Sequence, residues 1–361
     1  MSTSILTSPF ARLALRTLGM APLDREFRIT GSMENLERIL LVDSGDFSDI
    51  VFFLPVISEI RRLWPGIEIH MMVLDRWADM LRREAGLAGL IVYREEQLKV
   101  RSSSYFRLLK EIRNRSFDAA ILMGEELDPP RDLVAYVSQA PLRIGVFHEE
   151  REDLLNCMVR WSGQGRYKNE LALELTRIFG LGFDPSTWRF KPREEERRGA
   201  EQMIHFRKPV KEQLLIGVDL SHGKSRRRFA SENLSYLIDH LIEKLGGKVM
   251  LMNIDEGQEK ELLEFRRRLR SEALDMPRQN LRETVALLAS CSLIVSGNTE
   301  FFHMAVAAGV PCIGLFSEAD GQRWEPRDRT HAIVLRGKQG ESVALSEIDS
   351  AVDRVLHATP A

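Results

Sequence analysis

Two polar turns and one basic loop in this sequence carry residue types that suit phosphate and hydroxyl chemistry. The turn Asp43–Asp49 holds three carboxylates and follows the buried stretch Ile39–Val42. The loop 221–228 holds one lysine and three arginines, whose guanidinium groups can bind phosphate oxygens in pairs. The turn 296–299 stands directly before a helical stretch, and the free N–H groups of a helix N-terminus attract phosphate.

The last of these turns belongs to the segment 293–316, for which the sequence predicts strand, turn, helix and strand. Leu293–Val295 is a short apolar strand, and Asn298 or Thr299 is placed to cap the helix that follows. The helix ends at Gly309, and a proline two residues later blocks its continuation. Ligands of open α/β sheets bind beyond the carboxyl ends of the strands, so this turn is the first candidate for a nucleotide site.

The basic loop follows the predicted strand Leu215–Leu220. Its candidate phosphate-binding residues are Ser221, His222, Lys224 and Arg227. A solvated surface loop would have the same composition, so both interpretations stay open.

Two carboxylates are candidates for binding a ribose. Glu256 and Glu259 follow the predicted strand Lys248–Met252, and a carboxylate after this strand is placed to bind a ribose hydroxyl pair. The surrounding segment is highly charged, so a plain surface role fits both residues as well.

The elements that must position these residues alternate between strands and helices in two sets. The predicted strands of the first set are Ile39–Val42, Glu68–Leu74, Leu90–Tyr93, Asp118–Met123 and Leu142–Val146, and those of the second set are Leu215–Leu220, Lys248–Met252, Leu293–Val295, Cys312–Phe316 and His331–Leu335. Strands that alternate with helices at this spacing indicate parallel sheets. The sequence therefore predicts an α/β fold with two doubly wound, Rossmann-like domains that face a central cleft.

The domain boundaries follow from the same alternation. We expect an N-terminal leader at 1–36, a first domain at 37–185, a linker at 186–212, a second domain at 213–340 and a C-terminal helix at 341–361. Gly180–Lys208 is expected to be a loop followed by a charged segment. Phe10–Met20 fits a short basic amphipathic helix. It is either a helix docked on the protein, a frayed tail, or an anchor on a membrane surface.

Composition limits the class of protein. The 361 residues carry a net charge of −2, which gives no overall attraction to nucleic acid, and no nucleic-acid-binding motif is present. The 3 cysteines lie far apart, which argues against a disulfide framework or a zinc site and fits a reducing cytosol. No stretch approaches the roughly 20 apolar residues of a membrane span. The basic residues between Lys99 and Arg115 form either a solvated helix face or a contact with anionic lipid headgroups.

Several motifs occur in a characteristic order along the chain. They are Ile39–Val42 followed by Ser48-Asp49 and Leu54-Pro55, then Arg143-Ile-Gly145, then Asn298-Thr299, His303-Met-Ala, Gly309-Val-Pro and Leu315-Phe316, with Trp324 beyond. Together they resemble the motifs of glycosyltransferase family 9, the ADP-heptose:lipopolysaccharide heptosyltransferases. The resemblance covers about residues 38–340, and the element from Asn298 to Phe316 is its most specific part.

The resemblance implies a GT-B architecture, in which the C-terminal domain binds the donor nucleotide and the N-terminal domain binds the acceptor. It implies inverting transfer of heptose from ADP-heptose to a lipopolysaccharide-core or other glycan acceptor, with no metal and no other cofactor. Asp49 matches the base proposed to deprotonate the acceptor hydroxyl, and helix capping is the alternative for this residue. The location implied is the cytoplasm, with a peripheral contact with the inner membrane as a further possibility.

The resemblance also assigns roles at the donor site. Arg227 matches a phosphate-binding lysine of the family, and Ser221 or His222 matches its hydroxyl groups. Thr299 and His303 would hold the diphosphate together with Arg227.

Two single residues and two short segments depart from the family pattern. Ser48 replaces a glycine, Asp43 replaces a basic residue, Asn298-Thr-Glu300 replaces Asp-Thr-Gly, and Ser317-Glu-Ala-Asp320 replaces Gly-Pro-Thr-Asp. An acidic turn at 43–49 should repel an anionic acceptor. Glu300 puts a charged side chain where the backbone should approach the diphosphate. The alternatives are therefore a catalytically impaired member that serves as a binding or scaffold protein, and a transferase with a different donor or acceptor.

Overall fold

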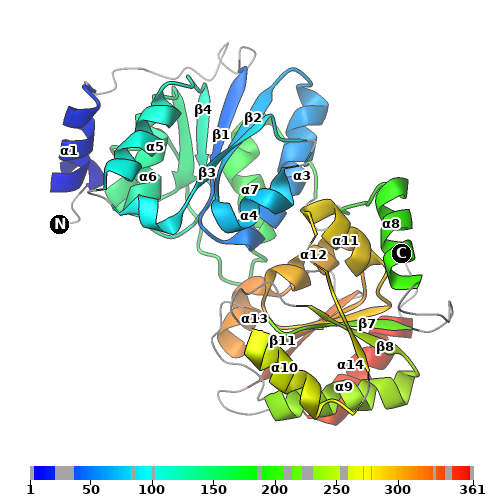
Figure 1. Ribbon diagram of the computed structural model, residues 1–361. Helices are drawn as coiled ribbons and strands as arrows, with labels where there is room; N and C mark the ends of the chain where they lie inside the picture. Colours follow the sequence, from blue (N-terminus) through cyan, green and yellow to red (C-terminus); the bar gives the residue numbers. More distant parts are fainter. Residues whose placement is uncertain are drawn as a thin grey trace. The chain divides into compact units, whose positions relative to one another are not determined.

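The protein consists of two compact units (Figure 1). The structure, a computed structural model, describes residues 4–20, 36–82, 84, 86–99, 102–184, 189–205, 214–221, 231–252, 259–270, 272–277, 279–327, 331–337 and 344–357, and their side chains except at 205, 231–234, 259–262 and 345. The first unit comprises Met1–Gly163 and Lys168–Pro185, and the second comprises Gln164–Tyr167 and Ser186–Ala361.

The first unit is built on a parallel sheet with strand order β3-β2-β1-β4-β5-β6. Its strands are β1 (Arg38–Val42), β2 (Glu68–Leu74), β3 (Gly89–Tyr93), β4 (Ala119–Leu122), β5 (Leu142–Val146) and β6 (Cys157–Val159). The central strand β1 pairs Leu40 with His70 on β2 and with Ala120 on β4. Because helices cover both faces of a parallel sheet, its central strands are almost continuously apolar.

The helices of the first unit follow from the strand order. They are α1 (Pro9–Thr17), α3 (Phe47–Leu63), α4 (Asp75–Leu81), α5 (Ser103–Arg113), α6 (Pro129–Val137) and α7 (Asn169–Thr176), with short 3-10 turns at Ile5–Thr7, Glu95–Leu98, Glu149–Arg151 and Arg177–Phe179. Right-handed crossovers place α3 and α4 on one face of the sheet and α5 and α6 on the other (Figure 1). Helix α7 packs against α3.

The second unit repeats this plan with strand order β12-β11-β10-β7-β8-β9. Its strands are β7 (Leu215–Asp219), β8 (Lys248–Met252), β9 (Ala273–Asp275), β10 (Leu293–Ser296), β11 (Cys312–Ser317) and β12 (Ala332–Gly337). Its helices are α8 (Glu194–His205), α9 (Ser231–Leu245), α10 (Glu259–Arg268), α11 (Leu281–Ala289), α12 (Glu300–Ala308), α13 (Glu318–Trp324) and α14 (Leu345–His357). The central strand β10 pairs Ile294 with Gly217 on β7 and with Cys312 on β11.

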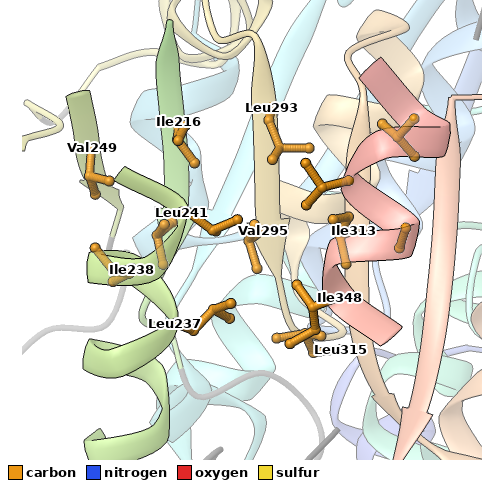
Figure 2. Packing of buried hydrophobic residues seen from close by; sticks show 14 of the residues in the cluster. Ile216, Leu237, Ile238, Leu241, Val249, Leu293, Val295, Ile313, Leu315 and Ile348 are labelled. Atoms are coloured by element: carbon orange, nitrogen blue, oxygen red, sulfur yellow. The ribbon is translucent and has the colours of Figure 1, made fainter. Parts of the chain in front are cut away.

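One hydrophobic cluster joins α9 and α14 to the sheet of the second unit. Figure 2 shows Leu237 and Leu241 of α9 beside Ile216 and Val295 of the sheet, with Ile348 of α14 on the other side of the cluster. All five side chains are buried. Burial of each such side chain stabilises the fold by about 1.5–3 kcal/mol, so this layer fixes the sheet whose carboxyl edge carries the donor-site candidates.

The prediction of two doubly wound parallel sheets is confirmed. Within the expected linker, the charged segment forms helix α8, which packs against α11. Its apolar side includes Ala200, and Glu196 pairs with Arg282 of α11 at 2.6 Å. Within the described ranges, no helix is both long enough and apolar enough to cross a bilayer.

Candidate active site

Asp49 lies in the first turn of α3, just beyond the carboxyl end of β1, and only 4% of its surface is exposed. Each oxygen of its carboxylate has a partner. Oδ1 lies 2.5 Å from Nζ of Lys168, and Oδ2 accepts a 2.5 Å hydrogen bond from the Ser44 hydroxyl. Helix α3 is capped by Asp46, whose Oδ1 accepts from the backbone N–H of Ser48 at 2.9 Å. The capping alternative therefore does not apply to Asp49.

Lys168 also approaches a second carboxylate. Its Nζ lies 3.8 Å from Oε1 of Glu125, in the loop that follows β4. The two carboxylates thus follow the neighbouring strands β1 and β4, one from the first turn of α3 and one from a loop, and both lie within 4 Å of the ammonium group. Sequence reasoning missed Lys168 because it belongs to none of the motifs.

Asp43 was predicted to add an exposed negative charge to the turn 43–49, but its side chain is buried. It is 2% exposed, and its carboxylate accepts hydrogen bonds from the Tyr93 hydroxyl at 2.7 Å and from the Leu74 N–H at 3.1 Å. The Arg131 guanidinium lies 3.8 Å away. Burial raises the pKa of Asp43 to about 6, although these partners oppose the rise. The expected repulsion of an anionic acceptor by this residue therefore loses its structural basis.

Asp219, at the end of β7, organises the donor-site candidates of the second unit. Its Oδ1 accepts a 2.8 Å hydrogen bond from the Ser221 N–H, and its Oδ2 accepts from the hydroxyls of Ser296, at 2.8 Å, and Thr299. Thr299 is also the N-cap of α12. Burial raises the pKa of Asp219. One carboxylate therefore links the first residue of the basic loop to the turn before α12.

His303, on α12, lies in a hydrogen-bonded chain of side chains. Its Nε2 is 3.0 Å from Oδ1 of Asn298, and its Nδ1 is 3.0 Å from the Tyr167 hydroxyl. The Asn298 amide donates to Asp320 at 3.2 Å, which identifies the other amide atom as the oxygen. An amide oxygen only accepts, so Nε2 of His303 carries a hydrogen, and in the neutral imidazole Nδ1 then accepts from the Tyr167 hydroxyl.

The same chain reaches one of the positions that depart from the family pattern. Ser317 caps α13 and donates a 2.6 Å hydrogen bond to Asp320. Asn298, a second such position, and His303 are 3% and 1% exposed. In this arrangement both residues are bound to protein partners, so their contact with a diphosphate stays a prediction.

The structure thus brings Ser221, Asn298, Thr299 and His303 together at the carboxyl edge of the second sheet and places Asp49 at that of the first. His222, Lys224, Arg227 and Glu256 lie outside the described residues, as does the side chain of Glu259, the first residue of α10. Asp219, Lys168 and Tyr167 are additional residues of these clusters. The only sequence signal for Asp219 was an acid at the end of an apolar strand.

Comparison with known proteins shows which family the chain belongs to. The sequence profile of glycosyltransferase family 9 (heptosyltransferase) matches residues 105–351, which is more than half of the chain. The comparison with curated proteins found no match.

Three solved structures show the same fold. A family 9 glycosyl transferase from Veillonella parvula has 16% identity and a TM-score of 0.73, over 89% of this chain and 97% of its own. ADP-heptose lps heptosyltransferase II from E. coli has 18% identity and a TM-score of 0.69, over 88% and 98%. E. coli heptosyltransferase WaaC with ADP-2-deoxy-2-fluoro heptose has 15% identity and a TM-score of 0.64, over 88% and 99%. The chain belongs to glycosyltransferase family 9 (heptosyltransferase), has the GT-B fold and is a glycosyltransferase.

Proposed function

We propose that this enzyme moves a sugar from a nucleotide-sugar donor to a glycan hydroxyl with inversion at the anomeric carbon. Asp49 takes the proton of the acceptor hydroxyl while its oxygen attacks the anomeric carbon. The bond between that carbon and the diphosphate oxygen breaks, and the nucleoside diphosphate leaves with the electron pair. The new bond forms on the face opposite the leaving group, which inverts the configuration.

The observation that carries this proposal is the environment of Asp49. Its carboxylate stands at the carboxyl end of the central strand of the first sheet, with one oxygen held by Lys168 and the other by Ser44. Each oxygen has a second lone pair that can accept a proton. A general base held in this way contributes about 10²–10⁴ to the rate.

The donor would bind at the carboxyl edge of the second sheet. Helix α12 begins there, and its N-terminus carries the positive end of the helix dipole, which favours a diphosphate. Ser221 and Thr299 are held side by side through Asp219. Lys224 and Arg227, in the loop that follows, would neutralise the leaving diphosphate without a metal. Glu256 and Glu259 stay the candidates for the ribose.

The donor class that family membership supports best is ADP-heptose. The acceptor would be a lipopolysaccharide core or another glycan, presented to a cytoplasmic enzyme at the surface of the inner membrane. The WaaC structure holds an ADP-heptose analogue and shares the fold of this chain, so an ADP-linked sugar is the first donor to test.

A second candidate is a transferase with a different donor, and one observation favours it. Asn298 and Ser317, which depart from the family pattern, both bond to Asp320. Substituted residues that share hydrogen bonds with one carboxylate indicate a site adapted to another ligand rather than one that has lost its function. A catalytically impaired binding protein is less well supported for the same reason.

Calorimetric titration of the protein with ADP, UDP, GDP and their sugars tests the donor assignment. We expect the tightest binding for an ADP-sugar, and a preference for UDP or GDP would support the second candidate. NMR of the product then gives its anomeric configuration. Absence of binding for every nucleotide would overturn both candidates, and a product with retained configuration would overturn the inverting mechanism.

A further inference from the structure

Lys168 is a buried cation between two carboxylates. Its Nζ lies 2.5 Å from Oδ1 of Asp49 and 3.8 Å from Oε1 of Glu125. The side chains of Lys168, Asp49 and Glu125 are 8%, 4% and 12% exposed. Water therefore screens these charges only weakly, and each charge acts strongly on the others.

The helix that follows Lys168 holds the backbone at this residue in place. Lys168 directly precedes α7, whose buried residues Leu171 and Leu175 lie on a helix that packs against α3, the helix of Asp49. This packing sets the spacing between the Lys168 backbone and the Asp49 backbone.

The loop of Glu125 is held independently. Nε2 of His148 lies 2.6 Å from the Glu125 carbonyl oxygen, and Arg151 donates to the carbonyl of Glu126. Arg151 is anchored in turn by two hydrogen bonds to Asp132, at 2.8 and 3.0 Å. These contacts hold the loop in place, and with it the Glu125 carboxylate that faces Lys168.

Stability alone does not explain such a cluster. Removing an ammonium group from water is energetically costly, and apolar residues of similar volume often stabilise a buried site as well or better. A buried ion pair at the proposed base, braced on both sides, therefore indicates a role in the reaction.

We propose that Lys168 is a positioning residue, which acts through Asp49 by fixing the direction of its carboxylate and supplying its counter-charge. Glu125 holds the ammonium group from the other side. This inference rests on the proposed function, because it takes Asp49 as the base. Misplacement of a reacting group by about 1 Å can cost about 100-fold in rate, so the effect should appear in kcat and leave donor binding in the second unit unchanged.

A double-mutant cycle tests the inference. Transfer is measured for the wild type, Lys168→Met, Lys168→Arg, Asp49→Asn and the double variant Asp49→Asn with Lys168→Met. We expect Lys168→Met to lower kcat about 100-fold with an unchanged donor KM, and Lys168→Arg to restore part of the loss. In the Asp49→Asn background the Lys168→Met change should cost almost nothing more, since a positioning residue has no effect without the group it positions.

The control is Arg62→Met on the same helix, because it removes an ion pair with Glu59 in which Arg62 is 66% exposed. It should leave kcat unchanged. Lys168→Gln, which keeps a hydrogen-bond donor, replaces the methionine variant if that protein does not fold, and the same cycle applies. If the change at Lys168 costs the same factor with and without Asp49, or costs nothing, the inference is overturned. If the wild type transfers no sugar, or Asp49→Asn is fully active, the proposed function fails first and the inference falls with it.

Discussion

The Tyr93 hydroxyl donates a 2.7 Å hydrogen bond to Oδ1 of Asp43 inside the first unit. Arg131 lies on the other side, and its Nε donates to the same Tyr93 hydroxyl at 2.9 Å. Glu95 pairs with Arg131 at 3.0 Å and acts on Asp43 as a like charge. Asp43 is thus a buried acid in a small polar network, and burial raises its pKa from 3.8 to about 6.

This network predicts a pH-dependent stability. The folded protein binds the proton of Asp43 more tightly than the unfolded chain does, so Asp43 stabilises the fold below about pH 4. That contribution, about 3 kcal/mol, is lost as the pH rises through about 6. Between about pH 4 and pH 6 the wild type should therefore lose stability relative to Asp43→Asn. Urea unfolding of both proteins across this pH range measures the change in their free energies of unfolding. Tyr93→Phe should move the transition to higher pH, and a constant difference would contradict the assignment.

Arg151 and Asp132 form a buried pair, with side chains 1% and 2% exposed. Arg151→Met leaves the Asp132 carboxylate buried and without this partner, and should cost about 3–5 kcal/mol in the free energy of unfolding. The double change with Asp132→Leu should recover much of the loss, because it removes both charges. The exposed pair of Arg62 and Glu59 is the control and should be worth less than about 1 kcal/mol. If Arg151→Met lowers the free energy of unfolding no more than the control does, Arg151 does not hold the loop of Glu125 in place.

Thr299 serves two partners with one hydroxyl. It accepts the Phe302 N–H as the N-cap of α12 and donates to Asp219. Thr299→Val keeps the shape and removes both contacts, so it should cost about 1–3 kcal/mol of stability and weaken donor binding measured by calorimetry. Ser296→Ala removes a donor to Asp219 but keeps the cap, and should have the smaller effect on both quantities. Equal effects would indicate that the cap is unimportant.

The sequence predicts the two sheets well because the central strands are buried on both faces and therefore apolar. Helix α8 is harder to predict, since its composition is strongly charged and only one side, around Ala200, meets the core. The edge strands β6 and β9 have three residues each, too few for a pattern to emerge.

In the candidate site, too, some features can be predicted from the sequence and others cannot. Local signals identify the turns that hold Asp49 and Thr299. They do not identify the partners that set the geometry, because these come from distant parts of the chain. Tyr167 is 136 residues from His303, and Asp219 is 80 residues from Thr299. Burial of Asp43 was missed for the same reason, since its hydrogen-bonding partner Tyr93 lies 50 residues away.

Glu300 is the first residue of α12, where the family pattern has glycine. If its charge opposes the diphosphate, Glu300→Gly should tighten the binding of ADP, measured by calorimetry. Glu300→Gln separates charge from bulk, because it removes only the charge. Glu300 also contributes an acidic side chain to the first turn of α12, where the helix dipole favours negative charge. Both variants therefore need a melting temperature. Unchanged ADP affinity in both would mean that the Glu300 carboxylate does not face the ligand.

The role of Asp49 is tested most directly by the turnover of Asp49→Asn, with the donor that calorimetry identifies. Asp46→Asn is the matched control, since it neutralises a carboxylate in the same turn and asparagine caps a helix as well as aspartate does. We predict that Asp49→Asn lowers kcat by about 10²–10⁴ and leaves donor affinity unchanged, while Asp46→Asn stays close to the wild type. Wild-type turnover in Asp49→Asn would contradict the assignment of this carboxylate as the base.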